Sequence, residues 1–214
     1  AHELRTPLTA ARLETSRLRR TGAGDPQGEE LISTIADSIA EDLDRLASMI
    51  SGFASFARLP KPTLETTDLA EITADFAETF ADAWSNITLH TEVPNDPVLT
   101  PADRKLLRDV LANLCENSSR AAADTPCSVH LTVARTGDGD PAIVVHDNAP
   151  GIPEAIADRL FEPYTSTRES SEGLGLGLAI SRKIMLDHGG DLELLATSTA
   201  GTTFRMTFAS GDRK

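Results

Sequence analysis

The sequence predicts a fold of two parts, an α helical hairpin that forms a four-helix bundle on dimerisation, followed by an α+β two-layer sandwich. Apolar residues recur at helical spacing through residues 1–60. Pro60 and Pro62 then form a stiff linker. From there to the end of the chain, helical and strand patterns alternate, which indicates one layer of each. The predicted domains are therefore residues 1–60 and 61–214.

Two helices are expected in the first domain. The first has an apolar stripe with four-three spacing, formed by Leu4, Leu8, Ala11, Thr15 and Leu18. Two glycines and a proline at 21–26 end it. A near-heptad stripe then runs from Ile32 to Ala57. One short and one long helix bury too little surface alone, so we expect a homodimer through the hairpin.

The second domain is expected to open on a helix after Asp68, which has the shape of a capping box with Glu71. The expected buried face of this helix comprises Leu69, Ile72, Phe76 and Phe80. Thr100 and Pro101 are expected to be the N-cap and first residue of a second helix, which runs to about Ala123.

The remaining elements follow from strand alternation, helical periodicity and glycine-rich turns. They are a strand at 87–93, strands at 128–134 and 142–146, a short helix at 153–160, a helix at 176–188 ended by Gly189 and Gly190, and a closing hairpin of 192–196 with 202–208.

Charge and composition exclude some function classes. The chain has 33 acidic and 20 basic residues, a net charge of −13, and most of the negative charge follows residue 60. Nucleic-acid binding needs a basic patch and is therefore not expected. No apolar run approaches the ~18–20 residues of a membrane span, so the fragment is predicted to be cytoplasmic. Cys115 and Cys127 are expected to be buried thiols rather than a disulfide.

A glycine-rich segment is the first candidate for chemistry. Gly173, Gly175 and Gly177 alternate along the chain and lead into a predicted helix. Glycine lets the backbone approach a ligand closely, and the free N–H groups of a helix N-terminus can bind phosphate. A flexible turn is the other interpretation of such a loop.

Polar residues at two further places could complete a nucleotide site. Asn113, Asn117 and Arg120 share one face of a predicted helix. An asparagine oxygen there could bind Mg²⁺, which takes few protein ligands, although ordinary boundary residues would look alike. Asp147 directly follows a predicted strand, where its carboxylate could accept a hydrogen bond from an adenine amino group. A plain turn would have the same composition.

In this order, the segments resemble the nucleotide-binding boxes of the ATPase domain shared by histidine kinases, gyrase-type topoisomerases, Hsp90 and MutL. This resemblance implies the Bergerat or GHKL type of α+β sandwich. The matching segments are 113–117 for the N box, 147–151 for G1, 161–164 for F and 173–178 for G2. His188, Gly189 and Gly190 follow as they do in histidine kinases.

The opening of the chain narrows the resemblance to one class. Residues 2–8, HELRTPL, are similar to the H box of sensor histidine kinases, and the whole chain therefore resembles a sensor histidine kinase core. Segments 56–62 and 161–168 further resemble the NtrY-like, nitrogen-regulation branch.

This resemblance implies ATP-dependent autophosphorylation on His2, with Mg²⁺, and then phosphoryl transfer to an aspartate of a response-regulator receiver domain. Glu3 would orient the imidazole and accept its proton. Thr6 would orient water for a reverse, phosphatase reaction.

The resemblance also implies the nucleotide contacts. Asn117, assisted by Asn113, would hold Mg²⁺, and Asp147 would select adenine. Arg120 would meet phosphate oxygens, with Arg168 on a lid formed by residues 165–173. The other positions assigned to the nucleotide are Gly151, Gly173, Gly175, Gly177 and Leu178.

Two departures from the family pattern predict weaker nucleotide binding. Ala149 stands where the G1 box usually has its first glycine, which would cost about 1 kcal/mol or more if that position needs a positive φ. Otherwise its methyl group would only reduce the space in the adenine pocket. Ala121 replaces an aromatic residue often found four residues after the second N-box asparagine. The alternative function is a nucleotide-binding adaptor dimer without phosphotransfer.

Overall fold

The computed structural model describes residues 9, 13, 15, 32–40, 43, 47, 50, 59–81, 86–123, 125–165 and 175–209. The chain divides into two compact units. One comprises Ala1–Leu59 with Tyr164–Leu176, and the other comprises Pro60–Pro163 with Gly177–Lys214.

Every described residue between positions 9 and 50 is helical, as the hairpin prediction requires, while the predicted turn at 21–26 lies outside the described residues. Ile35 is buried, but Leu43 and Ile50 are 55% and 62% exposed. These two residues are seven positions apart on the predicted near-heptad stripe, so part of that stripe is uncovered in the single chain. Among the described helices, none is long and apolar enough to cross a membrane.

The second unit begins with a small sheet that the sequence patterns did not predict. Residues 59–64 have no regular structure, in keeping with the proline linker. Strand β1 (Glu65–Asp68) then pairs antiparallel with β3 (Leu99–Ala102). Each strand has only four residues, too few for a clear alternation of apolar and polar positions.

Helix α3 (Leu69–Ala81) begins where the capping pattern predicts. One oxygen of Asp68 accepts hydrogen bonds from the N–H groups of Ala70 and Val98, both at 3.0 Å. Glu71 does not close a capping box, because it forms an ion pair with Arg104 at 3.1 Å instead. The predicted face of Leu69, Ile72, Phe76 and Phe80 is buried.

A five-stranded sheet forms the second layer of the sandwich. Its strands, in spatial order, are β2 (Ile87–Glu92), β4 (Cys127–Arg135), β5 (Pro141–Asp147), β7 (Gly201–Thr207) and β6 (Asp191–Ser198). β2 pairs parallel with β4, and all other pairs are antiparallel. The edge strand β6 contains a register shift between Leu194 and Ala196, which marks a β-bulge.

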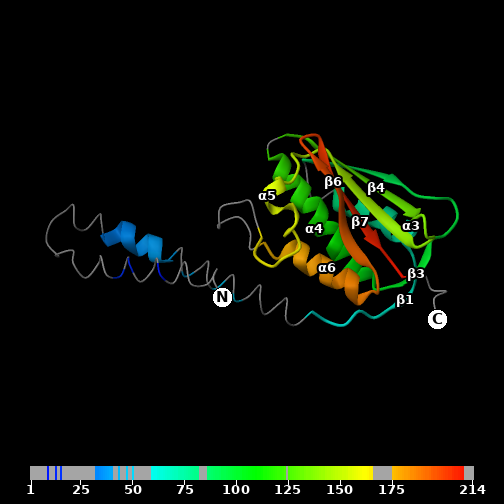
Figure 1. The fold of residues 1–214 in the computed structure, drawn as a ribbon, viewed down its shortest axis with the longest axis horizontal. Helices are drawn as coiled ribbons and strands as arrows, with labels where there is room; N and C mark the ends of the chain where they lie inside the picture. The colour runs from blue at the N-terminus through cyan, green and yellow to red at the C-terminus, as the bar shows by residue number, and fades with distance from the viewer. Residues whose placement is uncertain are drawn as a thin grey trace. The chain divides into compact units, whose positions relative to one another are not determined.

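Helices α3, α4 (Arg104–Ala122) and α6 (Gly177–Asp187) lie on one face of this sheet, with α4 beside α6 (Figure 1). The core lies between the layers, where buried alternate residues of β4 and β7 face the helices and α4 contributes its apolar side. The predicted α+β two-layer sandwich is therefore confirmed. Helix α5 (Glu154–Ala157) is shorter than the predicted 153–160.

The predicted N-cap of α4 is wrong. Thr100 and Pro101 lie in β3, paired with Thr67 and Thr66, because the chain is still extended there. The N-cap is Asp103. One of its oxygens accepts from the N–H groups of residues 105 and 106, both at 3.1 Å, and the other accepts from that of residue 63 at 3.0 Å.

The His-Gly-Gly segment ends α6 and fastens it to the start of α4. Gly189 has a φ of 77°, and the N–H of Gly190 donates to the Met185 carbonyl at 3.0 Å. Buried His188 donates from Nδ1 to the Ile184 carbonyl at 2.8 Å. Its Nε2 accepts from the Asp103 N–H at 3.0 Å, which requires a neutral ring.

Replacing the true N-cap, Asp103→Ala, should lower the free energy of unfolding by about 1–2 kcal/mol, because three backbone N–H groups lose their acceptor. Burial raises the pKa of Asp103, but the hydrogen bonds from these N–H groups outweigh it and hold the pKa below its usual value. The lost stability should thus be full above the unfolded-state pKa of about 3.9 and disappear as pH falls through the folded-state value.

Urea unfolding at several pH values checks this, with Asp109→Ala as the control. Asp109 lies on the exposed side of the same helix, where substitution should change stability by no more than about 0.5 kcal/mol. Equal losses in the two variants would contradict the capping role.

Candidate functional site

Helix α4 is the element on which the predicted site residues converge. Its buried side carries Leu107, Val110, Leu111 and Leu114, all essentially inaccessible to solvent. Asn113 and Asn117 are half-buried at the edge of this side, and Arg120 is exposed one turn further on. The helix therefore places the two asparagine amides at the boundary between the core and the solvent, and Arg120 in the solvent.

Asn113 joins α4 to the start of α6. Its Nδ2 donates to the Ser181 hydroxyl at 2.9 Å, which turns Oδ1 away from that contact. A Cβ on Gly177 would lie 2.3 Å from Asn113 Oδ1, closer than real atoms approach. A side chain at position 177 would therefore force the Asn113 amide to move, whereas glycine lets the first turn of α6, which also contains half-buried Leu178, rest on α4 around it.

Asn117 and Arg120 differ in how they are engaged. In the part of the chain that the structure describes, the Asn117 side chain makes no hydrogen bond, so its amide oxygen is available to a ligand. Arg120 donates to Glu116 at 3.1 Å in an exposed ion pair. Such a pair is worth little, so a phosphate could displace Glu116 from Arg120 at small cost.

Asp147 is the most buried charged residue of the site, at 5% exposure. One of its oxygens accepts from the N–H groups of Ala149 and Thr202, each at 3.1 Å. The other accepts from the Ser118 hydroxyl at 2.6 Å. Since Ser118 follows Asn117 in α4, the carboxylate is bonded to the same turn of the helix that carries the second asparagine.

The sequence analysis missed three supporting residues, namely Ser118, Ser181 and Thr202. Each bonds a predicted site residue that is at least 29 positions away, so no local spacing reveals the pairing. Only the position of Ser118 directly after Asn117 could have drawn attention to it.

The cysteines near this carboxylate are buried thiols, as predicted. Burial raises the pKa of Cys115 to about 12, and the nearby Cys127, Asp147 and Glu116 act in the same direction. Cys127 is also shifted upward, mainly by burial. Neither thiol is therefore a nucleophile at neutral pH.

The loop after β5 packs against the β6–β7 hairpin. A Cβ on Gly151 would lie 2.1 Å from the Ser198 carbonyl oxygen, and the N–H of Ile152 donates to Thr197 Oγ1 at 2.7 Å. Gly151 thus has a packing reason to be glycine. Buried Ala149 does not have a positive φ, so the backbone strain considered for that position is absent.

Gly175 belongs to the other unit, where it closes a turn. It has a φ of 61°, and its carbonyl accepts from the Tyr164 N–H at 2.9 Å. A Cβ there would lie 2.6 Å from the Thr165 carbonyl oxygen. Residues 164 and 165 therefore lie directly against Gly175.

Five predicted site residues lie outside the described residues, namely His2, Glu3, Thr6, Arg168 and Gly173. Their roles stay predictions.

Residues 102–211, more than half of the chain, match the family described as "Histidine kinase-, DNA gyrase B-, and HSP90-like ATPase". The chain belongs to this family. Residues 1–62 match the His Kinase A (phospho-acceptor) domain. A phospho-acceptor domain ahead of this ATPase domain is the arrangement of a sensor histidine kinase core, as predicted, and ATP is the nucleotide implied by the family.

Curated relatives agree with this assignment. The nitrogen regulation protein NtrY of Azorhizobium caulinodans is 36% identical over 97% of the chain. The histidine-protein kinase AtoS of Escherichia coli is 30% identical over 96% of it. The chain spans only 27% of the first relative and 33% of the second. The predicted resemblance to NtrY thus extends over nearly the whole of this chain.

Solved structures agree as well. Full-length ShkA in complex with AMPPNP has a TM-score of 0.63 at 25% identity, covering 98% of this chain and 45% of that one. The mycobacterial sensor histidine kinase MprB has a TM-score of 0.57 at 25% identity, covering 67% of this chain and 97% of that one.

Gly151→Ala should destabilise the protein by about 1–3 kcal/mol, because the new methyl group must displace the Ser198 backbone. Gly137→Ala is the matched control, since a Cβ there meets nothing within 4 Å. Thermal unfolding of both variants tests the packing explanation, which fails if they lose equal stability.

Proposed function

We propose that this chain transfers the γ-phosphoryl group of Mg-ATP to His2 and then to an aspartate of a response-regulator receiver domain. In this proposal residues 1–60 form the phosphotransfer and dimerisation domain and residues 61–214 the catalytic domain. The observation that carries it is the buried carboxylate of Asp147, fixed by three protein donors. One of them, Ser118, is the neighbour of Asn117, whose side chain makes no hydrogen bond within the described residues.

Asp147 is the adenine-selecting group of the proposal. Its Oδ2 accepts one protein hydrogen bond, from Ser118, and a carboxylate oxygen has a second lone pair to offer. The amino group of adenine could donate a hydrogen bond to this second lone pair. The three protein donors hold the carboxylate in place before the nucleotide arrives, so binding costs little side-chain entropy at Asp147.

The donor set beside Asp147 fits Mg²⁺. This ion prefers oxygen ligands and usually takes only one or two from the protein, with phosphates and water completing its shell. Asn117 supplies a half-buried amide that has no hydrogen-bond partner among the described residues, and we assign it as the ligand, assisted by Asn113. Bound Mg²⁺ would neutralise phosphate charge, which matters in a chain of net charge −13.

Phosphate oxygens would be received by Arg120, once it leaves Glu116, and by the free N–H groups at the start of α6, which include Leu178. Gly177 keeps that helix end free of a side chain. We place Gly173, Gly175 and Arg168 in a segment that closes over the nucleotide, and Gly151 in the loop that follows Asp147.

In the transfer step, one imidazole nitrogen of His2 forms a bond to the γ-phosphorus in line with the bond that breaks. The leaving oxygen departs with ADP. Glu3, next in the chain, would orient the ring and accept the proton of the other nitrogen. Histidine suits this step because its ordinary pKa near 6.5 leaves the ring largely neutral at pH 7.

Dimerisation and partner docking belong to the helical domain. Leu43 and Ile50 expose an apolar stripe that a second copy would cover in a four-helix bundle. The surface around His2 would then dock the receiver domain, with Thr6 orienting water for the phosphatase reaction. The AMPPNP complex of the relative ShkA supports nucleotide binding by this architecture. The adaptor alternative loses support, since Ala149 sits in ordinary backbone.

Incubation with γ-labelled ATP and Mg²⁺ should give an acid-labile, alkali-stable label that is absent in His2→Ala. His146→Ala, which removes an exposed histidine of the sheet, is the matched control and should keep the label. Label that persists in His2→Ala, or none in the wild type, would refute the proposal.

Removing Mg²⁺ with EDTA should weaken ATP binding by at least about tenfold, because phosphate repulsion from this acidic chain is then unopposed. Asn117→Ala should reproduce much of that loss with Mg²⁺ present, whereas Asn95→Ala, at an exposed bend, should not. Isothermal titration measures all three, and an affinity insensitive to EDTA would contradict the metal assignment.

A further inference from the structure

Three histidines form a row across the face of the large sheet that the helices leave open. His90 of β2 lies opposite His130 of β4, and His130 lies opposite His146 of β5. All three side chains are exposed. Side chains alternate along a strand, and the strand neighbours Leu131 and Val145 are buried against the helices. The three rings therefore point to the other side of the sheet.

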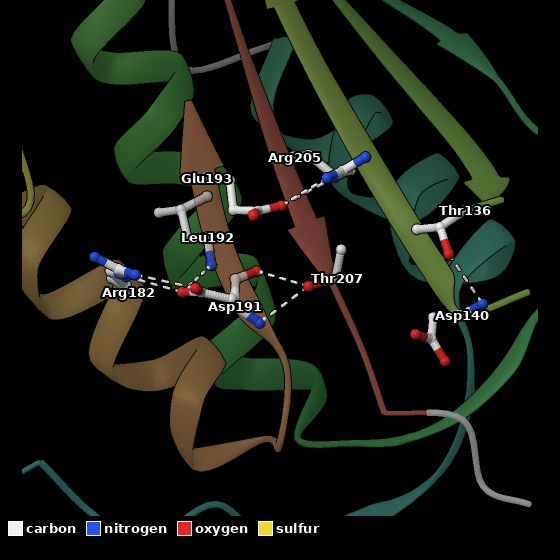
Figure 2. Close-up of polar contacts among 8 residues, drawn as sticks. All are labelled: Thr136, Asp140, Arg182, Asp191, Leu192, Glu193, Arg205 and Thr207. Carbon is white, nitrogen blue, oxygen red and sulfur yellow. Dashed lines mark hydrogen bonds and ion pairs between the residues drawn. The ribbon is translucent and has the colours of Figure 1, made fainter. Parts of the chain in front are cut away.

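Polar side chains at the β7 end of this open face are bonded to one another. His146 Nδ1 lies 2.9 Å from Thr203 Oγ1 of β7. Arg205, two residues further along β7, donates to Glu193 of β6 at 2.8 and 3.2 Å, as Figure 2 shows. These contacts engage side chains of β5, β7 and β6, so available ring nitrogens must be sought at the β2–β4 end.

His90 and His130, which we call the histidine pair, have nitrogens available to a ligand. Within the described residues the His90 ring makes no hydrogen bond, and that of His130 has only a long contact, 3.4 Å between Nε2 and Ser128 Oγ. The two rings stack, with centroids 4.6 Å apart and planes at 19°. Either ring can therefore turn without breaking a short hydrogen bond.

The separation of the histidine pair fits a shared transition-metal ion. Imidazole nitrogens bind Zn²⁺ at about 2.0–2.1 Å, so two rings on one ion at an angle of about 90–110° have centroids roughly 4.5–5.2 Å apart. The observed 4.6 Å lies in this range. The two strands thus hold the rings at a suitable spacing, and binding requires only that the exposed rings rotate out of the stack.

An ion at this place would take two ligands from the protein. Among the described residues, no group of three or more His, Cys, Asp or Glu side chains is arranged to hold a metal ion. The centroids of His130 and His146 are 6.4 Å apart, outside the range above. Water would complete the shell, as at the open position of catalytic zinc sites. Glu92, two positions along β2 on the same side, and the net charge of −13 favour a cation here.

We propose that His90 and His130 form a two-ligand site for a divalent transition-metal ion that prefers nitrogen, such as Zn²⁺, Cu²⁺ or Ni²⁺. Imidazole suits these ions, whereas Mg²⁺ prefers oxygen. Asp147 is buried on the helix side of the sheet and the histidine pair is exposed on the other, so this site is separate from the nucleotide site and does not rest on the proposed function. A bound ion would fasten the edge strand β2 to β4.

Calorimetric titration of the chelator-treated full chain with ZnCl₂ tests the inference. The wild type should bind Zn²⁺ at one site of this kind, and His90→Gln and His130→Gln should each weaken that binding at least about tenfold, because the remaining ring loses its chelating partner. His146→Gln is the matched control, since it removes an exposed histidine of the same row, and should change the Kd by no more than about twofold. Equal weakening in His146→Gln, or none in the other two variants, would overturn the proposal.

A double variant tests whether one ion is shared by both rings. If it is, His90→Gln combined with His130→Gln should bind Zn²⁺ little more weakly than either single variant, because the chelate is already lost. Losses that multiply in the double variant would show two independent sites and would overturn the proposal.

Thermal unfolding separates a built site from adventitious surface binding. Zn²⁺ should raise the Tm of the wild type and of His146→Gln, because it binds the folded state, but not that of His90→Gln. A Tm shift that persists in His90→Gln would overturn the proposal. Without Zn²⁺ the single variants should be as stable as the wild type within about 0.5 kcal/mol, since each replaces an exposed side chain. Should His130→Gln fail to fold, His90→Gln on the edge strand carries the same test.

Discussion

The buried carboxylate of Asp147 is the interaction on which the catalytic unit depends. Taking a charge out of water is costly unless hydrogen bonds compensate it, and here the donors come from α4, from the loop after β5 and from β7. These three elements must therefore meet at one place. The α4 donor, Ser118, is the neighbour of half-buried Asn117, so the hydrogen bonds that compensate this charge also fix the helix turn that carries a candidate site residue.

Close approach of backbone segments is the second constraint, and it explains why three positions around Asp147 and α4 are glycine. Gly151 lies against Ser198, Gly177 against Asn113, and Gly201 against the Asp147 carbonyl oxygen, which a Cβ would approach to 2.0 Å. The glycine-rich pattern is therefore explained at these positions by packing between elements. Ligand binding, where proposed, uses surfaces that this packing has already placed.

Most elements of the sandwich were predictable from the sequence because period-two and period-3.6 patterns depend only on neighbouring residues. The start of α3 at Asp68 and the end of α6 at Gly189 likewise depend on local hydrogen bonds and backbone conformation. It misplaced the start of α4, since Thr100 satisfies a cap pattern but pairs with Thr67 across the chain. The residues that support Asp147 were missed for the same reason, because Ser118 and Thr202 gain their meaning only through distant contacts. A family resemblance carries such long-range information, and for that reason Asn113, Asn117 and Asp147 could be predicted together as site residues, which stays a prediction.

The bulge in β6 has a consequence for assembly. An edge strand presents unpaired N–H and C=O groups, which can template the addition of a strand from another molecule. β6 is such an edge, but the register shift between Leu194 and Ala196 interrupts its ladder. The proposed homodimer would hold two catalytic units at high local concentration. With its regular hydrogen bonding interrupted, the β6 edge is a poor template for a strand of the twin sheet, so the bulge disfavours pairing between the two sheets at this edge.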